Sequence, residues 1–336
     1  MGTDSIDTPE RGGHGAVGHV PVLLKEAIDF LAVKRGGTYL DATVGLGGHS
    51  YEIARRLGAP GHLIGFDKDP AALEMAAKRL AVRSSSFAVR KSVDEEPTGN
   101  DEPPDWPLVT LIHGSFAELA KNEQRTANSE PRTTYDGILA DLGVSSLQLG
   151  DPARGFSFQA EGPLDMRMNP MSGETAEQVV NHIDERELAD VIYEFGEERR
   201  SRRIARAIVR SRPIRTTTQL VEVVSAAARS MNLKWKHERI HPATRTFQAL
   251  RIFVNRELDD LKALLEAAPS VLKPGGRLVV ISFHSLEDRI VKDALRDGAK
   301  QGWYQLLTKK PVTAGAEEID RNPRSRSAKM RAAEKV

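Results

Sequence analysis

The sequence contains no cysteine, which excludes a disulfide framework and any chemistry that depends on a thiolate. It also lacks an apolar run that approaches the roughly 18 residues of a membrane-spanning helix. No basic segment followed by an apolar one, the pattern of a secretion signal, is found at the N-terminus. A reducing cytosol is compatible with these absences, and we expect a cytoplasmic protein that has no membrane partner.

Two further absences concern chemistry. No segment matches the P-loop pattern G-x-x-x-x-G-K-[ST], so we do not expect ATP hydrolysis. The His and acidic residues do not occur at the spacing of a catalytic zinc site, so we do not expect a bound metal.

The composition that remains is that of an ordinary globular protein. The chain has 336 residues, of which 40% are hydrophobic and 28% charged, and it is long enough for one large domain or two. The net charge of +1 conceals local clusters of basic and of acidic residues. Residues 1–18 are rich in glycine and predict a disordered tail.

Residues 38–50 read as a buried strand, a glycine-rich turn and the start of a helix. Gly45, Gly47 and Gly48 allow positive φ angles and a close approach of a ligand to the backbone, and the helix that follows offers free N–H groups. Such a turn binds adenine-containing cofactors in open α/β sheets. Because Ser50 stands where the dinucleotide pattern G-x-G-x-x-G requires its third glycine, the turn indicates a nucleoside site but not an NAD site.

A second short strand, 61–67, ends in Asp67, which lies 19 residues beyond Gly48. This is close to the separation of about 20 residues between a glycine turn and a carboxylate that binds both ribose hydroxyls. The alternative is that Asp67 caps the helix expected over residues 70–80.

Two more strands follow, over residues 109–116 and 135–141. Phe116 at the end of the first can stack on an adenine or belong to the core. Asp141 ends the second. Because the carboxyl ends of neighbouring parallel strands converge, Asp41, the glycine turn, Asp67 and Asp141 are expected to face one site. The acidic stretch 90–107 before these strands predicts a solvated loop.

The strand pattern then disappears between about residues 150 and 246, where helices are expected over 175–181, 185–195, 197–210 and 218–228. One long helix opens at His241, residues 272–276 form a turn, and a fifth strand covers 277–285. We therefore divide the chain into an α/β domain of residues 19–149 and 247–336 and an inserted helical domain of residues 150–246. The basic C-terminal segment offers few core residues.

The third of these helices is rich in arginine. Residues 199–215 contain eight arginines and no acidic residue, with Arg199, Arg203, Arg206 and Arg210 on one stripe. A charge run of this kind is a solvated face or a surface for a polyanion. A nucleoside site without the nicotinamide pattern, next to such a segment, favours modification of a nucleic acid with S-adenosylmethionine as the cofactor.

From His19 onward the sequence resembles the MraW family of 16S ribosomal RNA cytosine-N4 methyltransferases. The resemblance rests on eight segments, residues 19–24, 47–50, 141–146, 155–158, 162–168, 196–199, 241–248 and 282–289. It implies a class I, Rossmann-like methyltransferase sheet with an inserted all-helical domain. The implied activity is methylation of N4 of a decoding-centre cytosine in 16S rRNA of the small ribosomal subunit.

The resemblance also implies the residues that contact S-adenosylmethionine: Gly47, Gly48, His49, Asp67, Phe116, Asp141 and Gln148. This chain departs from the family at Leu147, where relatives often carry proline, and in the greater length of the acidic loop.

Cytosine N4 is a poor nucleophile, so its methylation depends on positioning and electrostatics. His284, at the end of the fifth strand, can take the proton or make a structural hydrogen bond. Arg199, Arg203 and Arg206 are the candidates for gripping RNA phosphates. The competing hypotheses are a DNA cytosine-N4 methyltransferase and a non-catalytic RNA-binding assembly factor, and the sequence is compatible with a monomer or a homodimer.

Overall fold

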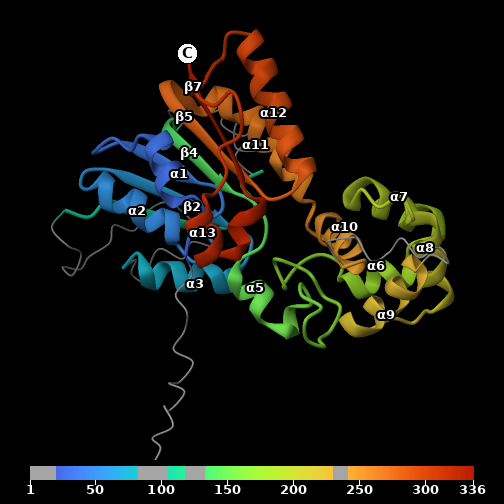
Figure 1. The fold of residues 1–336 in the computed structure, drawn as a ribbon. Helices are drawn as coiled ribbons and strands as arrows, with labels where there is room; N and C mark the ends of the chain where they lie inside the picture. Colours follow the sequence, from blue (N-terminus) through green and yellow to red (C-terminus); the bar gives the residue numbers. More distant parts are fainter. Residues whose placement is uncertain (1–19, 82–104, 118–132, 230–240) are drawn as a thin grey trace, which may run out of the picture.

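The computed structural model describes residues 20–81, 105–117, 133–229 and 241–336. The expected tail over residues 1–18 lies outside this part of the chain, as does most of the acidic stretch 90–107. Figure 1 shows an α/β unit built around one sheet, with a group of helices to one side of it.

The sheet has seven strands in the order β3-β2-β1-β4-β5-β7-β6. The first five are parallel, and β7 runs antiparallel to both of its neighbours. This sheet confirms the predicted α/β, Rossmann-like fold. The strands are β1 (Thr38–Asp41), β2 (His62–Asp67), β3 (Leu108–His113), β4 (Tyr135–Asp141), β5 (Leu272–Ser282), β6 (Tyr304–Leu306) and β7 (Lys329–Lys335).

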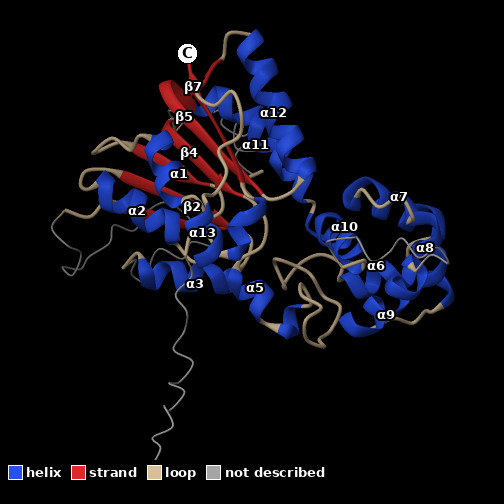
Figure 2. Ribbon diagram, viewed as in Figure 1, coloured by secondary structure: helices blue, strands red, loops and turns tan. Residues whose placement is uncertain are grey.

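Helices cover both faces of the sheet, which explains why its central strands are apolar on both sides (Figure 2). Successive side chains of a strand point to opposite faces, so Tyr39 and Leu139 pack with one group of helices and Leu40 and Ile138 with the other. The first group is α1 (Leu24–Leu31), α2 (Gly48–Leu57) and α3 (Pro70–Arg79); the second is α11 (Glu257–Val271) and α12 (Ser285–Lys300).

The inserted helices have a hydrophobic cluster of their own, drawn from residues between Phe156 and Leu250. Phe247 and Leu250 belong to it, so the expected boundary between residues 246 and 247 falls inside a helix that packs on the helical unit. No helix in the part of the chain described is long and apolar enough to cross a bilayer. The helices are α5 (Ser146–Gly150), α6 (Ala176–His182), α7 (Glu185–Gly196), α8 (Ser201–Arg210), α9 (Thr217–Ala228) and α10 (Ala243–Asn255).

The long helix expected from His241 is in fact two helices. Arg256 has a φ of 52° and separates α10 from α11. The turn expected over residues 272–276 lies within the first residues of β5, where Gly275 has a φ of 74° and the pairing with β4 jumps from Leu272 opposite Tyr135 to Arg277 opposite Gly137. Apolar spacing could not reveal the break between α10 and α11, since it continues across that break.

The C-terminal segment contradicts the expectation of a basic tail with few core residues. Residues 329–335 form β7 between β5 and β6, and Met330, Ala332 and Ala333 are buried. Arg331 is buried too, and its charge is compensated because its Nε donates to Oδ1 of Asp288 at 2.7 Å. Small residues and a paired cation carry little of the apolar signal by which strands are predicted.

Met330 tests whether β7 is a structural strand. Its side chain is fully buried in the cluster that α1 and α2 share with the sheet. Replacing it with alanine should lower the free energy of unfolding by about 2–5 kcal/mol, because contacts are lost and a cavity remains. Denaturant unfolding measures this change. Met171, which is 83% exposed, is the matched control, and M171A should change the value by about 0.5 kcal/mol or less. Equal effects of the two substitutions would contradict the placement of β7.

Candidate cofactor site

The candidate site lies where the strand order reverses, between β1 and β4. Asp41, Asp67 and Asp141 are the last residues of β1, β2 and β4, and open α/β sheets bind ligands at this edge. A cavity of about 570 Å³ opens there. Gly45, Asp67 and Asp141 all line it, as expected, whereas Asp41, which was expected to face the same site, does not.

The glycine turn is fixed by the segments around it. Gly45 and Gly47 have φ values of 53° and 75°, which side chains disfavour. A Cβ on Gly48 would lie 2.3 Å from Cγ of Pro21, so the N-terminal segment leaves room for glycine alone. Gly47 faces Ala76 of α3 instead of the cavity.

Asp41 lies behind the cavity and does not line it. Its carboxyl group is 1% exposed and accepts hydrogen bonds from Ser50 Oγ at 2.5 Å and from the Thr43 N–H at 3.1 Å. Burial raises the pKa of Asp41 to about 6, although both hydrogen bonds favour the ionised form. Asp41 therefore holds the start of α2 against β1.

Asp67 does line the cavity. Its two oxygens accept the N–H groups of Gly45 at 2.7 Å and Asp69 at 2.8 Å, while burial raises its pKa to about 6. The cap of α3 is Asp69, which accepts the Ala71 N–H at 3.1 Å. The alternative that Asp67 caps this helix is thus wrong.

Asp141 and His49 face each other across the floor of the cavity. Oδ2 of Asp141 lies 3.5 Å from Nδ1 of His49, and His49 Nε2 lies 3.0 Å from the Val22 carbonyl oxygen. Oδ1 of Asp141 is buried and has no hydrogen-bond partner among the described residues. Burial, with the nearby carboxyl groups of Asp41 and Glu287, holds the pKa of Asp141 well above its usual range. This carboxyl group is therefore suited to receive a cationic ligand.

Phe116 and Gln148 also line the cavity, and both are tied to the surrounding structure. Phe116 is 8% exposed and packs in the core cluster with residues of α11. It therefore belongs to the core and also borders the cavity in which an adenine is expected. The Gln148 amide accepts the Ser145 N–H at 2.9 Å and donates to Asp69 at 2.9 Å. The contacts of these two residues with a cofactor stay predictions.

His284 caps α12 and is not among the residues that line the cavity, although its neighbours Phe283 and Glu287 are. Its Nε2 lies 3.1 Å from Oε1 of Glu287. Burial raises the pKa of Glu287, but His284 and Arg251 outweigh this effect and lower it below the usual range. The packing favours the structural reading of His284, and its role as a proton acceptor stays a prediction.

The three arginines predicted to bind RNA lie on the helical unit, away from the lining of this cavity. Arg203 donates to the carbonyls of Ala227 and Arg229 at the end of α9, and Arg206 pairs with Glu185 at 3.3 Å. Arg199 is exposed and lines a second cavity, of about 780 Å³. The sequence had shown no compensating acid, because Glu185 lies 21 residues from Arg206.

Two further segments that line the cavity were not predicted from the sequence: the first residues described and the segment around residues 321–327. Val20 and Val22 line it, as do Arg321 and Arg324 from α13 (Ala316–Arg321) and the residues after it. The Leu23 N–H donates to Oε1 of Glu318 at 2.7 Å, and burial lowers the pKa of Arg324. Figure 1 shows α13 lying over the first helices of the sheet. No local motif signals such a contact between distant segments.

Asp41 predicts a pH dependence of stability. Its pKa is about 6 in the folded protein against an ordinary 3.8, so the folded state retains a proton that the unfolded state has lost between these values. Its contribution is present below pH 4 and is lost as the pH rises through 6. In Asp41→Asn this loss is removed, so the variant should gain about 3 kcal/mol relative to the wild type between pH 4 and 7. Urea unfolding across this range measures the difference, and parallel curves for the two proteins would contradict it.

Comparison with known proteins identifies the family of this chain. Residues 16–336 match the MraW methylase family. A ribosomal RNA small subunit methyltransferase H from Koribacter versatilis is 68% identical over 98% of this chain and 99% of its own length. Its counterpart from Acidobacterium capsulatum is 62% identical over 94% of this chain and 98% of its own length, and that from Sorangium cellulosum is 48% identical over 95% and 91%. The chain therefore belongs to the MraW methylase family and is an S-adenosylmethionine-dependent methyltransferase.

Proposed function

We propose that this methyltransferase acts on N4 of a decoding-centre cytosine in 16S rRNA of the small ribosomal subunit, in the cytoplasm. The relatives that carry the name ribosomal RNA small subunit methyltransferase H support this substrate. The observation that carries the proposal is the cavity at the carboxyl edge of the sheet. The glycine turn, Asp67 and Asp141 meet there, and Oδ1 of Asp141 has no hydrogen-bond partner in the part of the chain that the structure describes.

The residues at this edge fit the cofactor. Gly45 has no neighbour closer than 4.0 Å to the position of a Cβ and leaves the backbone open to an approaching nucleoside, and Asp67 offers its remaining lone pairs to the ribose hydroxyls. Asp141, backed by His49, is the acceptor for a positive group, and its raised pKa falls when a cation replaces the missing partner. Bound S-adenosylmethionine supplies the methyl group.

The chain's own contribution to the reaction is to place the cytosine amine and to accept hydrogen bonds from its N–H groups. The lone pair of N4 is delocalised into the ring, so the amine must be held in line with the methyl group. Leu142, Gly143 and Val144 line the cavity directly after Asp141. Gly143 has a φ of 96°, a conformation that turns the peptide groups of this segment. The backbone carbonyl oxygens of these three residues are therefore our candidates to accept hydrogen bonds from the cytosine amine.

The substrate side of the site lies across the first turn of α12. Glu287 of this turn lines the cofactor cavity, whereas Leu286 and Arg289 line the second cavity with Arg199 and Arg245. The two cavities therefore share a wall. Arg199 has no ion pair within the described ranges, and Arg245 lies 3.7 Å from Glu198. We assign Arg199 to an RNA phosphate. Arg206, whose side chain is 58% exposed, and Arg203, which is held against the end of α9, are assigned to further phosphates.

The activity is tested by incubating the protein with labelled S-adenosylmethionine and either free 16S rRNA or small subunits, followed by mass spectrometry of the nucleosides. We expect N4-methylcytidine. In Asp67→Ala the loss of a charge-assisted hydrogen-bond acceptor should weaken cofactor binding about 10- to 100-fold, whereas Glu74→Ala, on the exposed side of α3, should not change it.

In a parallel incubation with DNA, methyl label in DNA and none in rRNA would favour a DNA methyltransferase. Cofactor binding without transfer to any nucleic acid would favour the assembly factor. Unchanged cofactor affinity in Asp67→Ala would remove Asp67 from the site.

Arg199 is tested through the salt dependence of RNA binding. Arg199→Ala should weaken binding to 16S rRNA and reduce the slope of log K against log salt by about 1, because one phosphate contact and its released counterion are lost. Cofactor affinity should be unchanged. The matched control is Arg186→Ala, an exposed arginine of α7 that lines neither cavity. An unaltered slope in Arg199→Ala would return this residue to the solvated-face reading.

A further inference from the structure

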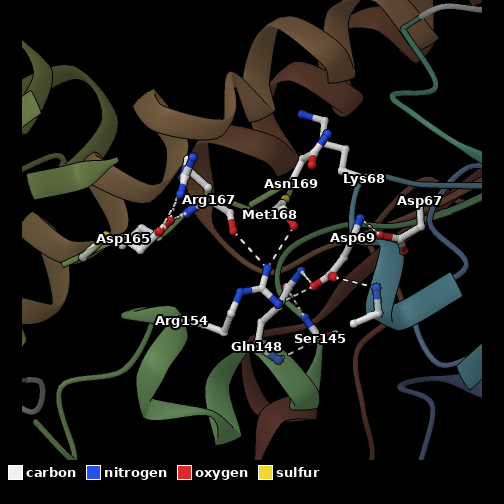
Figure 3. Close-up of polar contacts among 12 residues, drawn as sticks. Asp67, Lys68, Asp69, Ser145, Gln148, Arg154, Asp165, Arg167, Met168 and Asn169 are labelled. Atoms are coloured by element: carbon white, nitrogen blue, oxygen red, sulfur yellow. Dashed lines mark hydrogen bonds and ion pairs between the residues drawn. The ribbon is translucent and has the colours of Figure 1, made fainter. Parts of the chain in front are cut away.

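The two residues that follow Asp67 make an unusual set of contacts with the chain that leads into the helical unit. Asp69 is completely buried. Its Oδ1 caps α3, while its Oδ2 accepts hydrogen bonds from Gln148 Nε2 at 2.9 Å and from Arg154 Nη1 at 2.8 Å (Figure 3). The backbone N–H of Asp69 also donates to the carboxyl group of Asp67, which lines the cofactor cavity, so Asp69 is linked to the cavity by one hydrogen bond.

Arg154 links Asp69 to the loop of residues 166–168. Its Nη2 donates to the carbonyl oxygens of Arg167 at 3.0 Å and Met168 at 2.9 Å. The side chain is 15% exposed and its partner Asp69 is not exposed at all. A buried ion pair of this kind contributes little net stability, since desolvation offsets the attraction, but its planar fork fixes geometry. Three groups are held at set positions by one guanidinium.

The same loop is held from the other side by Asn255, at the end of α10. Asn255 Oδ1 accepts the Met168 N–H at 2.7 Å, and its Nδ2 donates to the Met166 carbonyl at 2.7 Å. The carbonyl of Asn255 accepts from Lys68 Nζ at 2.6 Å, and Lys68 also pairs with Asp260. Both clamps on residues 166–168 therefore return to the two residues next to Asp67.

The clamped loop has consequences on both sides. Met168 lines the cofactor cavity. Met166 has a φ of 61°, and a non-glycine residue keeps such a conformation only where its surroundings impose it. Just upstream, the carbonyls of Leu164 and Asp165 accept the N–H groups of Glu177 and Ala176 at 2.6 and 2.7 Å, which fixes the start of α6. The loop thus connects the cavity to the helical unit.

We propose that Arg154 is a positioning residue, which sets the helical unit and its bound RNA relative to the cofactor by holding residues 166–168 against Asp69. The inference rests on the proposed function for the identity of the RNA substrate, though not for the clamp. Arg154 contacts neither the cofactor cavity nor the second cavity. It acts through Met168, and Asn255 acts with it from the opposite side.

The test is Arg154→Lys, which keeps the charge beside Asp69 but cannot reach the two loop carbonyls at the same time. We expect kcat for methyl transfer to small subunits to fall about 10- to 100-fold, because displacements of the order of 1 Å at a reacting pair have effects of this size. The affinity for S-adenosylmethionine, measured by calorimetry, should stay within about twofold. Hydrogen exchange at residues 164–168 should become faster, with no matching change in β1 or β4.

Arg167→Lys is the matched control. Arg167 lies in the same loop, but its guanidinium pairs with Asp165 at 2.8 Å and points away from Arg154 (Figure 3). This variant should retain wild-type kcat and wild-type exchange at residues 164–168. Asn255→Ser, which releases the loop from the other side, should reproduce the pattern of Arg154→Lys and decides the question if the lysine variant does not fold.

The proposal is overturned if kcat and exchange in Arg154→Lys match the wild type, if Arg167→Lys shows the same losses, or if cofactor affinity falls by the same factor as kcat. Failure of the proposed function has a different signature. If the wild type methylates no cytosine of 16S rRNA, the exchange and calorimetry experiments still report whether Arg154 holds the loop.

Discussion

The placement of three carboxyl groups at one edge of a parallel sheet is the constraint on which the site depends. Asp41, Asp67 and Asp141 lie at the ends of adjacent or nearby strands; Asp41 is buried, whereas Asp67 and Asp141 are half-buried and line the cavity. Asp41 and Asp67 are satisfied by the glycine turn and by Ser50, which ties the turn to the sheet. Asp141 has one carboxyl oxygen without a partner in the described chain. Asp41 and Asp67 are therefore fixed by the surrounding structure, whereas Asp141 can still bind a positively charged group.

A second set of contacts carries this rigidity outward. The residues after β2 hold the loop at 166–168, and the first turn of α12 separates the cofactor cavity from the second cavity. The helical unit has its own hydrophobic cluster, against which Val144 and Leu149 from the segment after β4 also pack. Apolar contacts and directional hydrogen bonds therefore both join the helical unit to the sheet.

The sequence predicted the parts of this structure that depend on local pattern. The glycine turn, Asp67 and Asp141 converge as expected because strand ends in a parallel sheet must meet. Helix α9 begins within one residue of its predicted start, and the structure shows Thr216 capping it. What could not be predicted depends on distant partners: the pairing of Arg331 with Asp288, the carbonyls that receive Arg203, and the contribution of Arg324 to the cavity. In each case the partner is remote in sequence and the residue type alone suggests exposure.

The position of β7 has a consequence for biosynthesis. It is the last strand in the chain, yet it lies inside the sheet and is the only neighbour of β6 within the described structure. While the nascent polypeptide is being elongated, β5 presents an open edge, and the wall containing Arg321 and Arg324 has not been made. The lining of the cavity is therefore completed only when translation has passed Ser327, and the edge of β5 is paired only when residues 329–335 have followed, so a product interrupted before these points lacks part of the pocket wall or exposes an unpaired strand edge.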